Sequence, residues 1–344
     1  MNPFKYILIG LLILMSFHVS AQKSKKKKKG KAPVELHFNG IAISDSGFYD
    51  ENNLKSGQWR EYALDTFQSA TDTTPAQLVI VKEQGLYVKG KKQGEWKVLM
   101  ATDKQPSFYW ELMGNASYAD GKKHGWQKRY TTDNQLVSQE YFANGKLDSM
   151  SVFYYINGVP QLVIQYKNGV QHGKSYEFYP NRIAKKAVDY VNGYSHGKLE
   201  IYHPNGTLKE SGNVVNGKFK GEYSWHYDTG VLKQKGFFED TLKTGKWQTY
   251  YPTGELESKY TYENNLAQGE WKCYHKNGQL WSVRQYKDSK LWEVVSNFNP
   301  EGKTRNAGTL KDGTGTILIY NDAGEVSKKL NYVAGLETKL NDDQ

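Results

Sequence analysis

A unit of 24 residues recurs along most of this chain, and it constrains the fold more strongly than any single motif does. In one clear copy, residues 244–267, the leading glycine is Gly245, and Trp247, Tyr250 and Tyr262 follow it. Counted from this glycine as position zero, the aromatic residues stand at +2, +5 and +17. A repeat of fixed period predicts a stacked array in which each unit packs on its neighbours, so a globular core is not required.

The leading position recurs over seven consecutive steps of 24 residues without a slip. Further units begin at Gly315, and upstream at Gly57 and Gly94, where insertions interrupt the period. We count about eleven units, with irregular ones at both ends, as expected because the terminal units of an array face water. Some units replace the leading glycine or the turn glycine at +9, and these are predicted to keep the hairpin but to change its turn. The replacements are Ser149, Glu293 and Arg182.

Each unit is predicted to be a β-hairpin with strands at +1 to +6 and +11 to +17. Both segments are rich in aromatic and β-branched residues, which favour strands. Asn-Gly pairs such as Asn192-Gly193 and Asn216-Gly217 separate successive units and supply the positive φ that tight hairpin turns need. No segment of useful length after residue 32 has the period of a helix. The predicted fold is therefore all-β: an elongated, single-layer, solenoid-like antiparallel meander of about eleven stacked β-hairpins.

Large side chains at +5 and +17 are interpreted as a packed row that joins hairpin to hairpin. Positions +2 and +5 differ by an odd number, so in a regular strand their side chains face opposite sides. The tryptophans at +2 are therefore the candidate contact surface, an exposed track that stacks on glycan rings or docks a partner. The alternative is that this second face is packed as well. The candidates are Trp59, Trp96, Trp247 and Trp271.

Residues 1–21 resemble an export signal, with Lys5 before an apolar run and small residues before Gln22. The apolar run is shorter than the ~20 residues of a membrane span, and an uncleaved anchor is the alternative. Seven lysines in residues 22–32 weigh against export, because positive charge after an apolar run tends to stay in the cytoplasm. We nevertheless expect an exported protein, in the periplasm or at the envelope or surface of a bacterium. The predicted plan is a signal peptide (1–21), a flexible linker (22–32), a cap or degenerate repeat (33–56) and the repeat array (57–340).

The positive charge of the chain is concentrated in its first 32 residues, which hold eight lysines and no acidic residue. The rest of the chain has 38 basic residues against 36 acidic ones, so the repeat body is nearly neutral. A nucleic-acid partner is not expected, because such proteins carry positive charge over the folded surface. The lysine run is either a solvated linker or an electrostatic tail that attaches to a membrane surface or another anionic envelope surface. Its core is Lys25, Lys26, Lys27, Lys28 and Lys29.

No catalytic residue, cofactor site or metal site is predicted. Three histidines, His124, His172 and His196, precede leading glycines, but equivalent residues of successive hairpins lie ~10 Å apart. Such a row cannot converge on one metal ion, whose nitrogen ligands sit at ~2.1 Å. The single cysteine, Cys273, excludes an intrachain disulfide and is interpreted as a small packed residue.

The pattern G-x-W-x-x-Y-Y-x-x-G-x-L, followed by Y-x-N-G-x-x-x-G, resembles the MORN repeat. It is most similar to the bacterial 24-residue MORN repeat variant, whose proteins often carry the label of YwqK-family antitoxin. The resemblance covers residues 57–335, and its best copies begin at Gly245 and Gly269. It implies a β-hairpin array that binds or scaffolds, and lipid binding has been proposed for the family.

The favoured function is an exported, non-enzymatic scaffold that binds a protein or an envelope polymer through an extended hairpin face. The alternatives are a membrane-surface or anionic-lipid binder, an antitoxin-like inhibitor and a cell-wall hydrolase. Because template residues explain the hairpin, function is expected where units depart from the template. Those places are the two insertions, the units of Ser149 and Glu293, and the lysine tail.

Overall fold

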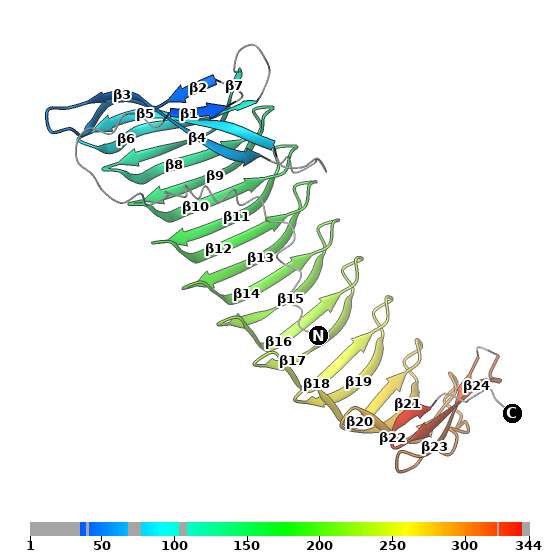
Figure 1. Cartoon of the computed structure of the whole chain (residues 1–344). Helices are drawn as coiled ribbons and strands as arrows, with labels where there is room; N and C mark the ends of the chain where they lie inside the picture. Colours follow the sequence, from blue (N-terminus) through cyan, green and yellow to red (C-terminus); the bar gives the residue numbers. More distant parts are fainter. Residues whose placement is uncertain (1–34, 39–40, 68–76, 103–108, 322, 339–344) are drawn as a thin grey trace. The chain divides into compact units, whose positions relative to one another are not determined.

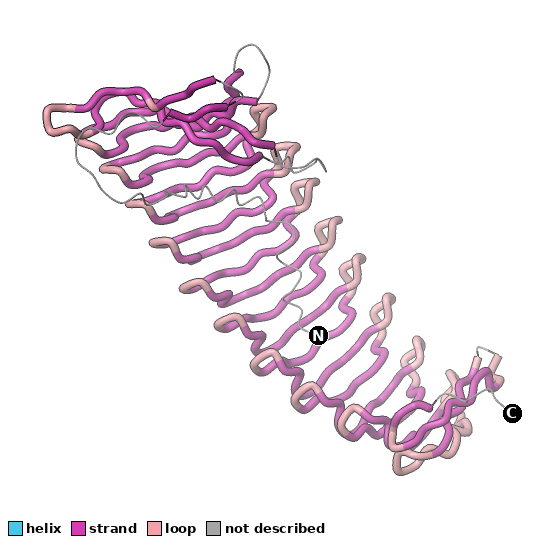
Figure 2. The backbone as a smooth tube through the Cα atoms, in the orientation of Figure 1, coloured by secondary structure: helices cyan, strands magenta, loops and turns pink. Residues whose placement is uncertain are grey.

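The computed structural model describes residues 35–38, 41–67, 77–102, 109–321 and 323–338, and within them it contains strands and no helix (Figure 2). The described residues accordingly include no helix long and apolar enough to cross a membrane. The chain forms two compact units, residues 1–146 and residues 147–344. In both units the strands follow one another as antiparallel neighbours, so the all-β meander predicted from the repeat is confirmed.

The first unit contains a two-stranded pair, β1–β2, and a meander from β3 to β9 (Figure 1). The hairpins beside the two predicted insertions are longer than the others, because β4 pairs with β5 as far as Phe67 and Gln77, and β6 pairs with β7 as far as Thr102 and Tyr109. Residues 68–76 and 103–108 of these insertions lie outside the described residues. The strands are β1 (Glu35–Phe38), β2 (Ile41–Ser44), β3 (Ser46–Tyr49), β4 (Lys55–Phe67), β5 (Gln77–Val88), β6 (Lys91–Thr102), β7 (Tyr109–Ala119), β8 (Lys122–Tyr130) and β9 (Leu136–Ala143).

The second unit contains thirteen successive strands, β10 to β22, and a three-stranded sheet, β23–β24–β25, near its end (Figure 1). The meander strands are β10 (Lys146–Tyr154), β11 (Pro160–Lys167), β12 (Val170–Phe178), β13 (Ala184–Val191), β14 (Tyr194–Tyr202), β15 (Leu208–Val215), β16 (Lys218–His226), β17 (Leu232–Glu239), β18 (Leu242–Tyr250), β19 (Leu256–Glu263), β20 (Leu266–Tyr274), β21 (Leu280–Lys287) and β22 (Lys290–Asn297). The last sheet comprises β23 (Gly315–Tyr320), β24 (Val326–Val333) and β25 (Leu336–Thr338).

Two kinds of turn alternate along the meander. The turn between units is a two-residue loop in which both residues have positive φ, as at Asn192 (51°) and Gly193 (84°), and this is the type I′ geometry expected of Asn-Gly. The turn inside a unit closes with two backbone hydrogen bonds around one left-handed residue at +9. Arg182 holds this position with φ of 71° and keeps both hydrogen bonds, so the prediction that its turn changes is wrong.

In the units before Gly315, the leading residue is not at the start of a strand, as the sequence suggested, but inside one. Strand β18, for example, begins at Leu242, three residues before Gly245. Gly245 has φ of 64° and lies in a bulge, where residues 245–247 face residue 236 of the preceding strand. Ser149 adopts the same left-handed conformation with φ of 59°, whereas Glu293 avoids it and its strand carries a different register shift. A serine therefore keeps the left-handed conformation of the leading residue, whereas a glutamate does not.

Neighbouring 24-residue repeats are joined at both edges of the sheet by hydrogen bonds that recur from one repeat to the next. At one edge the +6 side chain donates to the backbone carbonyl 23 residues later, as from Tyr251 Oη to the Tyr274 oxygen at 2.7 Å. At the other edge the second residue of each type I′ turn donates its N–H to the carbonyl 22 residues earlier, as from Gly217 to Ser195 at 2.9 Å. These two rows of bonds fix the stacking of successive hairpins.

Candidate functional site

Three of the four candidate tryptophans at +2 are interior residues and Trp271 is half-buried, so the exposed aromatic track predicted from the sequence is wrong. Trp59, Trp96 and Trp247 are 4%, 1% and 0% exposed. The strand register explains why: Trp247 is opposite Tyr260, and Gly245 is opposite Tyr262, so positions +2, +15 and +17 share one face. The prediction failed because it took +5 as the marker of the buried face, whereas the +5 residues are only half-buried.

The size of a buried +2 side chain is matched to the residue that faces it from the preceding strand. A Cβ built on Gly236 would lie 2.1 Å from the Trp247 ring, and one built on Gly85 would lie 2.5 Å from the Trp96 ring. In another unit the smaller Leu199 faces Val188 instead. A tryptophan at +2 is therefore fully buried where the preceding strand presents backbone without a side chain.

A lysine four residues earlier covers three of these tryptophans. The motif is K-x-G-x-W, at residues 55–59, 92–96 and 243–247, and the ammonium lies 3.9–4.6 Å from the ring centroid. Trp271 has Ala267 in place of the lysine. It is half-buried and instead stacks on Tyr260, with ring centroids 3.9 Å apart. The K-x-G-x-W motif is visible in the sequence, and it is the signal that these tryptophans are covered and not exposed.

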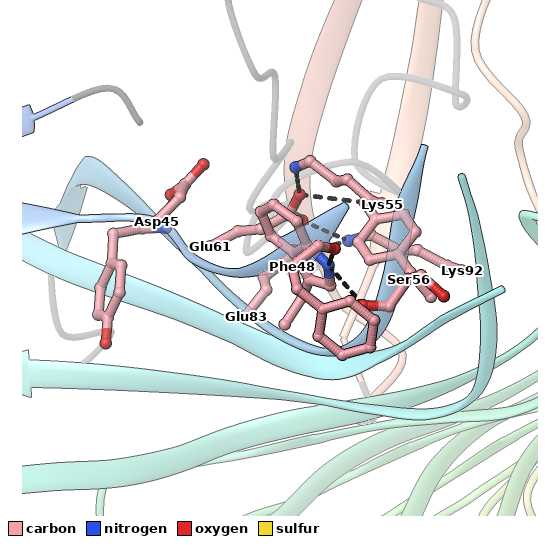
Figure 3. Close-up of polar contacts among 10 residues, drawn as sticks. Asp45, Phe48, Lys55, Ser56, Glu61, Glu83 and Lys92 are labelled. Atoms are coloured by element: carbon pink, nitrogen blue, oxygen red, sulfur yellow. Dashed lines mark hydrogen bonds and ion pairs between the residues drawn. The ribbon is translucent and has the colours of Figure 1, made fainter. Parts of the chain in front are cut away.

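Two of these lysines, Lys55 and Lys92, belong to a charged network in the first compact unit, residues 1–146, which is drawn in Figure 3. Lys55 donates to Glu61 at 2.5 Å, Lys92 lies 3.3 Å from the same carboxylate, and Tyr87 Oη donates to it at 3.0 Å. Lys92 also pairs with Glu83. The cluster therefore joins strands β4, β5 and β6 above the rings of two tryptophans.

The pKa values in this network describe paired charges. Burial alone would raise the pKa of Glu61, but the hydrogen bond from Lys55 and the charge of Lys92 outweigh it and hold the pKa below its ordinary value. Burial would lower the pKa of Lys92, but Glu83 and Glu61 outweigh it and raise the pKa. Burial and the Glu61 charge raise the pKa of Tyr87. Glu61 thus stays ionised and holds no proton to donate, which makes it a structural anchor and a poor general acid.

The histidines single out no metal site. His196 lies in the bulge before Gly197, and His203 is a +6 residue whose Nε2 is 3.1 Å from the His226 oxygen, 23 residues later. Across the described part of the chain, no three His, Cys, Asp or Glu side chains lie together in a way that would hold a metal ion. Cys273 is buried and free, and the packed environment inferred from the repeat is confirmed. Lys25 to Lys29 and residues 1–32 as a whole lie outside the described residues.

A row of exposed apolar side chains follows the type I′ turns of the second unit, and sequence reasoning missed it. Its members flank successive turns and are 37–62% exposed. Neighbouring turns touch, since a Cβ on Gly193 would lie 3.5 Å from Val170 of the preceding unit. We call this surface the edge row; it consists of Val170, Val191, Tyr194, Val215, Leu242 and Leu266.

The sequence of four of these repeats matches a known family model. The MORN repeat variant matches four consecutive segments, residues 195–216, 220–240, 243–264 and 267–288. The chain therefore carries MORN repeats. Each matched segment begins one or two residues after the start of β14, β16, β18 or β20, and it ends in the following type I′ turn. A MORN repeat in this chain is therefore one hairpin with the turn that follows it.

Comparisons beyond the MORN repeats are uninformative. No curated protein matches the sequence. A porin-like protein from Bacteroides uniformis is 8% identical over 70% of this chain and 94% of its own, with a TM-score of 0.18. The Tc holotoxin pore of Photorhabdus luminescens is 8% identical over 83% of this chain and 20% of its own, with a TM-score of 0.13. Overlaps of this quality support no argument about fold or function.

Proposed function

We propose that this protein is an exported, non-enzymatic scaffold whose MORN repeats bind a partner protein through the edge row. The carrying observation is that exposed apolar side chains flank five successive turns, and that in four of the five units one position supplies them. That position, three residues before the leading residue, holds Val170, Tyr194, Leu242 and Leu266. Contiguous exposed apolar surface usually marks a contact site.

The template does not require an apolar residue at this place. The same position holds Lys146, Lys218 and Lys290 in other units, whose hairpins are intact. The hairpin therefore does not require an apolar residue at this position, and binding of a partner would explain why several repeats have one. Five of the six members of the edge row are aliphatic, and Tyr194 is its one aromatic residue. Aliphatic side chains pack on other apolar side chains, whereas carbohydrate rings stack on aromatic faces, so the row favours a protein over an envelope polymer.

Two observations support a non-enzymatic role. The prominent carboxylate cluster, Glu61 with Glu83, is committed to Lys55 and Lys92. The most conspicuous template residues, Trp247 and its equivalents, pack inside the array. Export is supported by the sequence of residues 1–21, and a mature amino terminus at Gln22 is the expected result of mass spectrometry on the protein from its own cells.

Photo-crosslinking in the producing cell tests the binding surface. A photoreactive amino acid at Leu242 should give one discrete protein adduct, whereas the same group at Lys246, an exposed polar position of the same strand, should give none. Substitution of Val170 and Leu266 by lysine should abolish the adduct from position 242. The circular dichroism spectrum should be unchanged, because other units carry lysine there naturally.

Three outcomes oppose the proposal. Equal cross-linking from positions 242 and 246 would mean that the edge row is not a selective surface. An adduct that survives the lysine substitutions would place the contact elsewhere. Binding to anionic phospholipid vesicles that disappears on deletion of residues 22–32, with no protein adduct, would favour the membrane-surface alternative.

A further inference from the structure

An open cleft of about 270 Å³ lies in the second unit, where the chain leaves the 24-residue template. After β22 an irregular segment, residues 298–314, is held by isolated bridges, and β23 then returns to the array. The cleft is bounded by residues of β21 and β22, by this segment and by β23. The side chains that define its chemistry are Trp281, Arg284, Arg305 and Tyr320.

The cleft is positively charged. Its lining includes two arginines and no aspartate or glutamate. Within the described residues neither Arg284 nor Arg305 forms an ion pair with a carboxylate. Glu257 acts electrostatically on Tyr251 and Cys273 but does not line the cleft. Two guanidinium groups without carboxylate partners form a ready site for an anion, which they can bind in bidentate fashion.

Both arginines are held in place by aromatic rings. The Arg284 guanidinium carbon is 5.4 Å from the Trp281 ring centroid, and its Nε donates to Ser282 Oγ at 3.2 Å. The Arg305 guanidinium carbon is 4.9 Å from the Tyr320 ring centroid. The Tyr320 hydroxyl donates to the Asn306 oxygen at 2.8 Å, which fixes that ring in turn. The cations are therefore preorganised next to apolar ring surface.

One polar atom in the wall of the cleft is closed off from the cleft itself. Asn297 is 6% exposed, and its Oδ1 is buried and has no hydrogen-bond partner among the described residues. A ligand in the cleft does not reach this oxygen, so recognition rests on the two arginines and the aromatic rings. Tyr251 and His275 also line the cleft, but their polar atoms already contact the carbonyls of Tyr274 and Phe298.

We propose that this cleft binds one acidic sugar unit, a uronic acid. Its carboxylate pairs with Arg284 and Arg305, and the face of the ring packs on the aromatic walls. The volume lies just below the ~300 Å³ lower limit of small-molecule pockets, so it suits a single sugar residue, free or at the end of a polymer. The site is distinct from the edge row, and its test is independent of the scaffold proposal.

Isothermal titration calorimetry on the full chain, with D-galacturonic acid as the probe, tests the assignment. D-Galactose, which has the same ring without the carboxylate, and inorganic phosphate, which has charge without a ring, are the matched probes. Galacturonate should bind with at least about tenfold higher affinity than either one, because the site needs both the anion and the ring. Arg284→Gln and Arg305→Gln should each weaken galacturonate binding about tenfold, and Arg60→Gln, an exposed position of the first unit, should leave it unchanged.

Each outcome decides the matter. Phosphate binding as strong as galacturonate binding would identify a plain anion site and overturn the sugar assignment. Galacturonate binding that both arginine variants retain, or no binding at millimolar concentration, would also overturn it. If a glutamine variant loses its circular dichroism spectrum, Arg284→Lys replaces it; this variant keeps the charge but loses bidentate pairing, and an unchanged affinity for galacturonate would again contradict the proposal.

Discussion

Replacement of Gly236 by alanine tests the size match that seats Trp247. The new Cβ would lie 2.1 Å from ring atom Cδ2, whereas nonbonded carbons prefer ~3.5–4.0 Å. The ring would have to retreat by about 1.5 Å, but it is fully buried, with the ring centroids of Phe238, Tyr262 and Trp225 5.4–5.8 Å away. Overpacking of this kind costs about 1–3 kcal/mol. The entropic gain of about 0.4–1 kcal/mol from glycine to alanine offsets part of that cost.

The decisive experiment is a double-mutant cycle with Trp247→Leu, since Leu199 faces the larger Val188 at the equivalent place. Trp247→Leu alone should destabilise the chain by about 2–4 kcal/mol through the cavity it leaves. In that background Gly236→Ala should be neutral or stabilising, which gives a coupling free energy of about 1–3 kcal/mol. Urea unfolding followed by circular dichroism measures all four variants. An equal cost of Gly236→Ala in both backgrounds would refute the steric argument.

Three further predictions concern single sites. Arg182→Gly should stabilise the chain by about 1 kcal/mol in urea unfolding, because Arg182 holds a left-handed φ of 71° that glycine adopts without strain; no gain in the midpoint would mean that the arginine side chain compensates. Glu61 has a pKa held below its ordinary value of 4.5, so its contribution to stability is present above pH 4.5 and is lost as the pH falls through the folded pKa. Glu61→Gln should therefore flatten the acid limb of a stability–pH curve, and a parallel curve would contradict the assignment. Burial raises the pKa of the Cys273 thiol, so a disulfide reagent should react slowly at pH 8 and quickly in urea; fast reaction in the native state would mean that the strand opens locally.

The period of the repeat was enough to predict the hairpins, because turn chemistry is local. Asn192-Gly193 needs no tertiary contact to favour a type I′ turn, and the register of both flanking strands follows from it. The bulge at the leading glycine was not predicted. A glycine at the head of a motif looks like a turn, and only the pairing of residues 245–247 against residue 236 shows that it lies inside a strand.

The buried face was misassigned for a related reason. Alternation along one strand says which residues share a face, but it does not say which face is buried. That depends on neighbouring residues: Gly236 on the preceding strand leaves room for Trp247, and Lys243, on the same strand as Trp247, covers its ring. The sequence did contain the signal, since a glycine stands eleven residues before Trp96 and before Trp247, and a lysine stands four before each.

A repeat template separates residues that build the array from residues that are left for binding. Trp247, Gly245 and Tyr251 each serve a contact that recurs in other units, so their chemistry is consumed by stacking. A position that holds lysine in some units and an exposed leucine in others is under no such demand, and neither is Arg305, which lies in the segment where the template has ended. Because stacking cannot account for Leu242 or for Arg305, the binding functions of this protein are best sought at those two places.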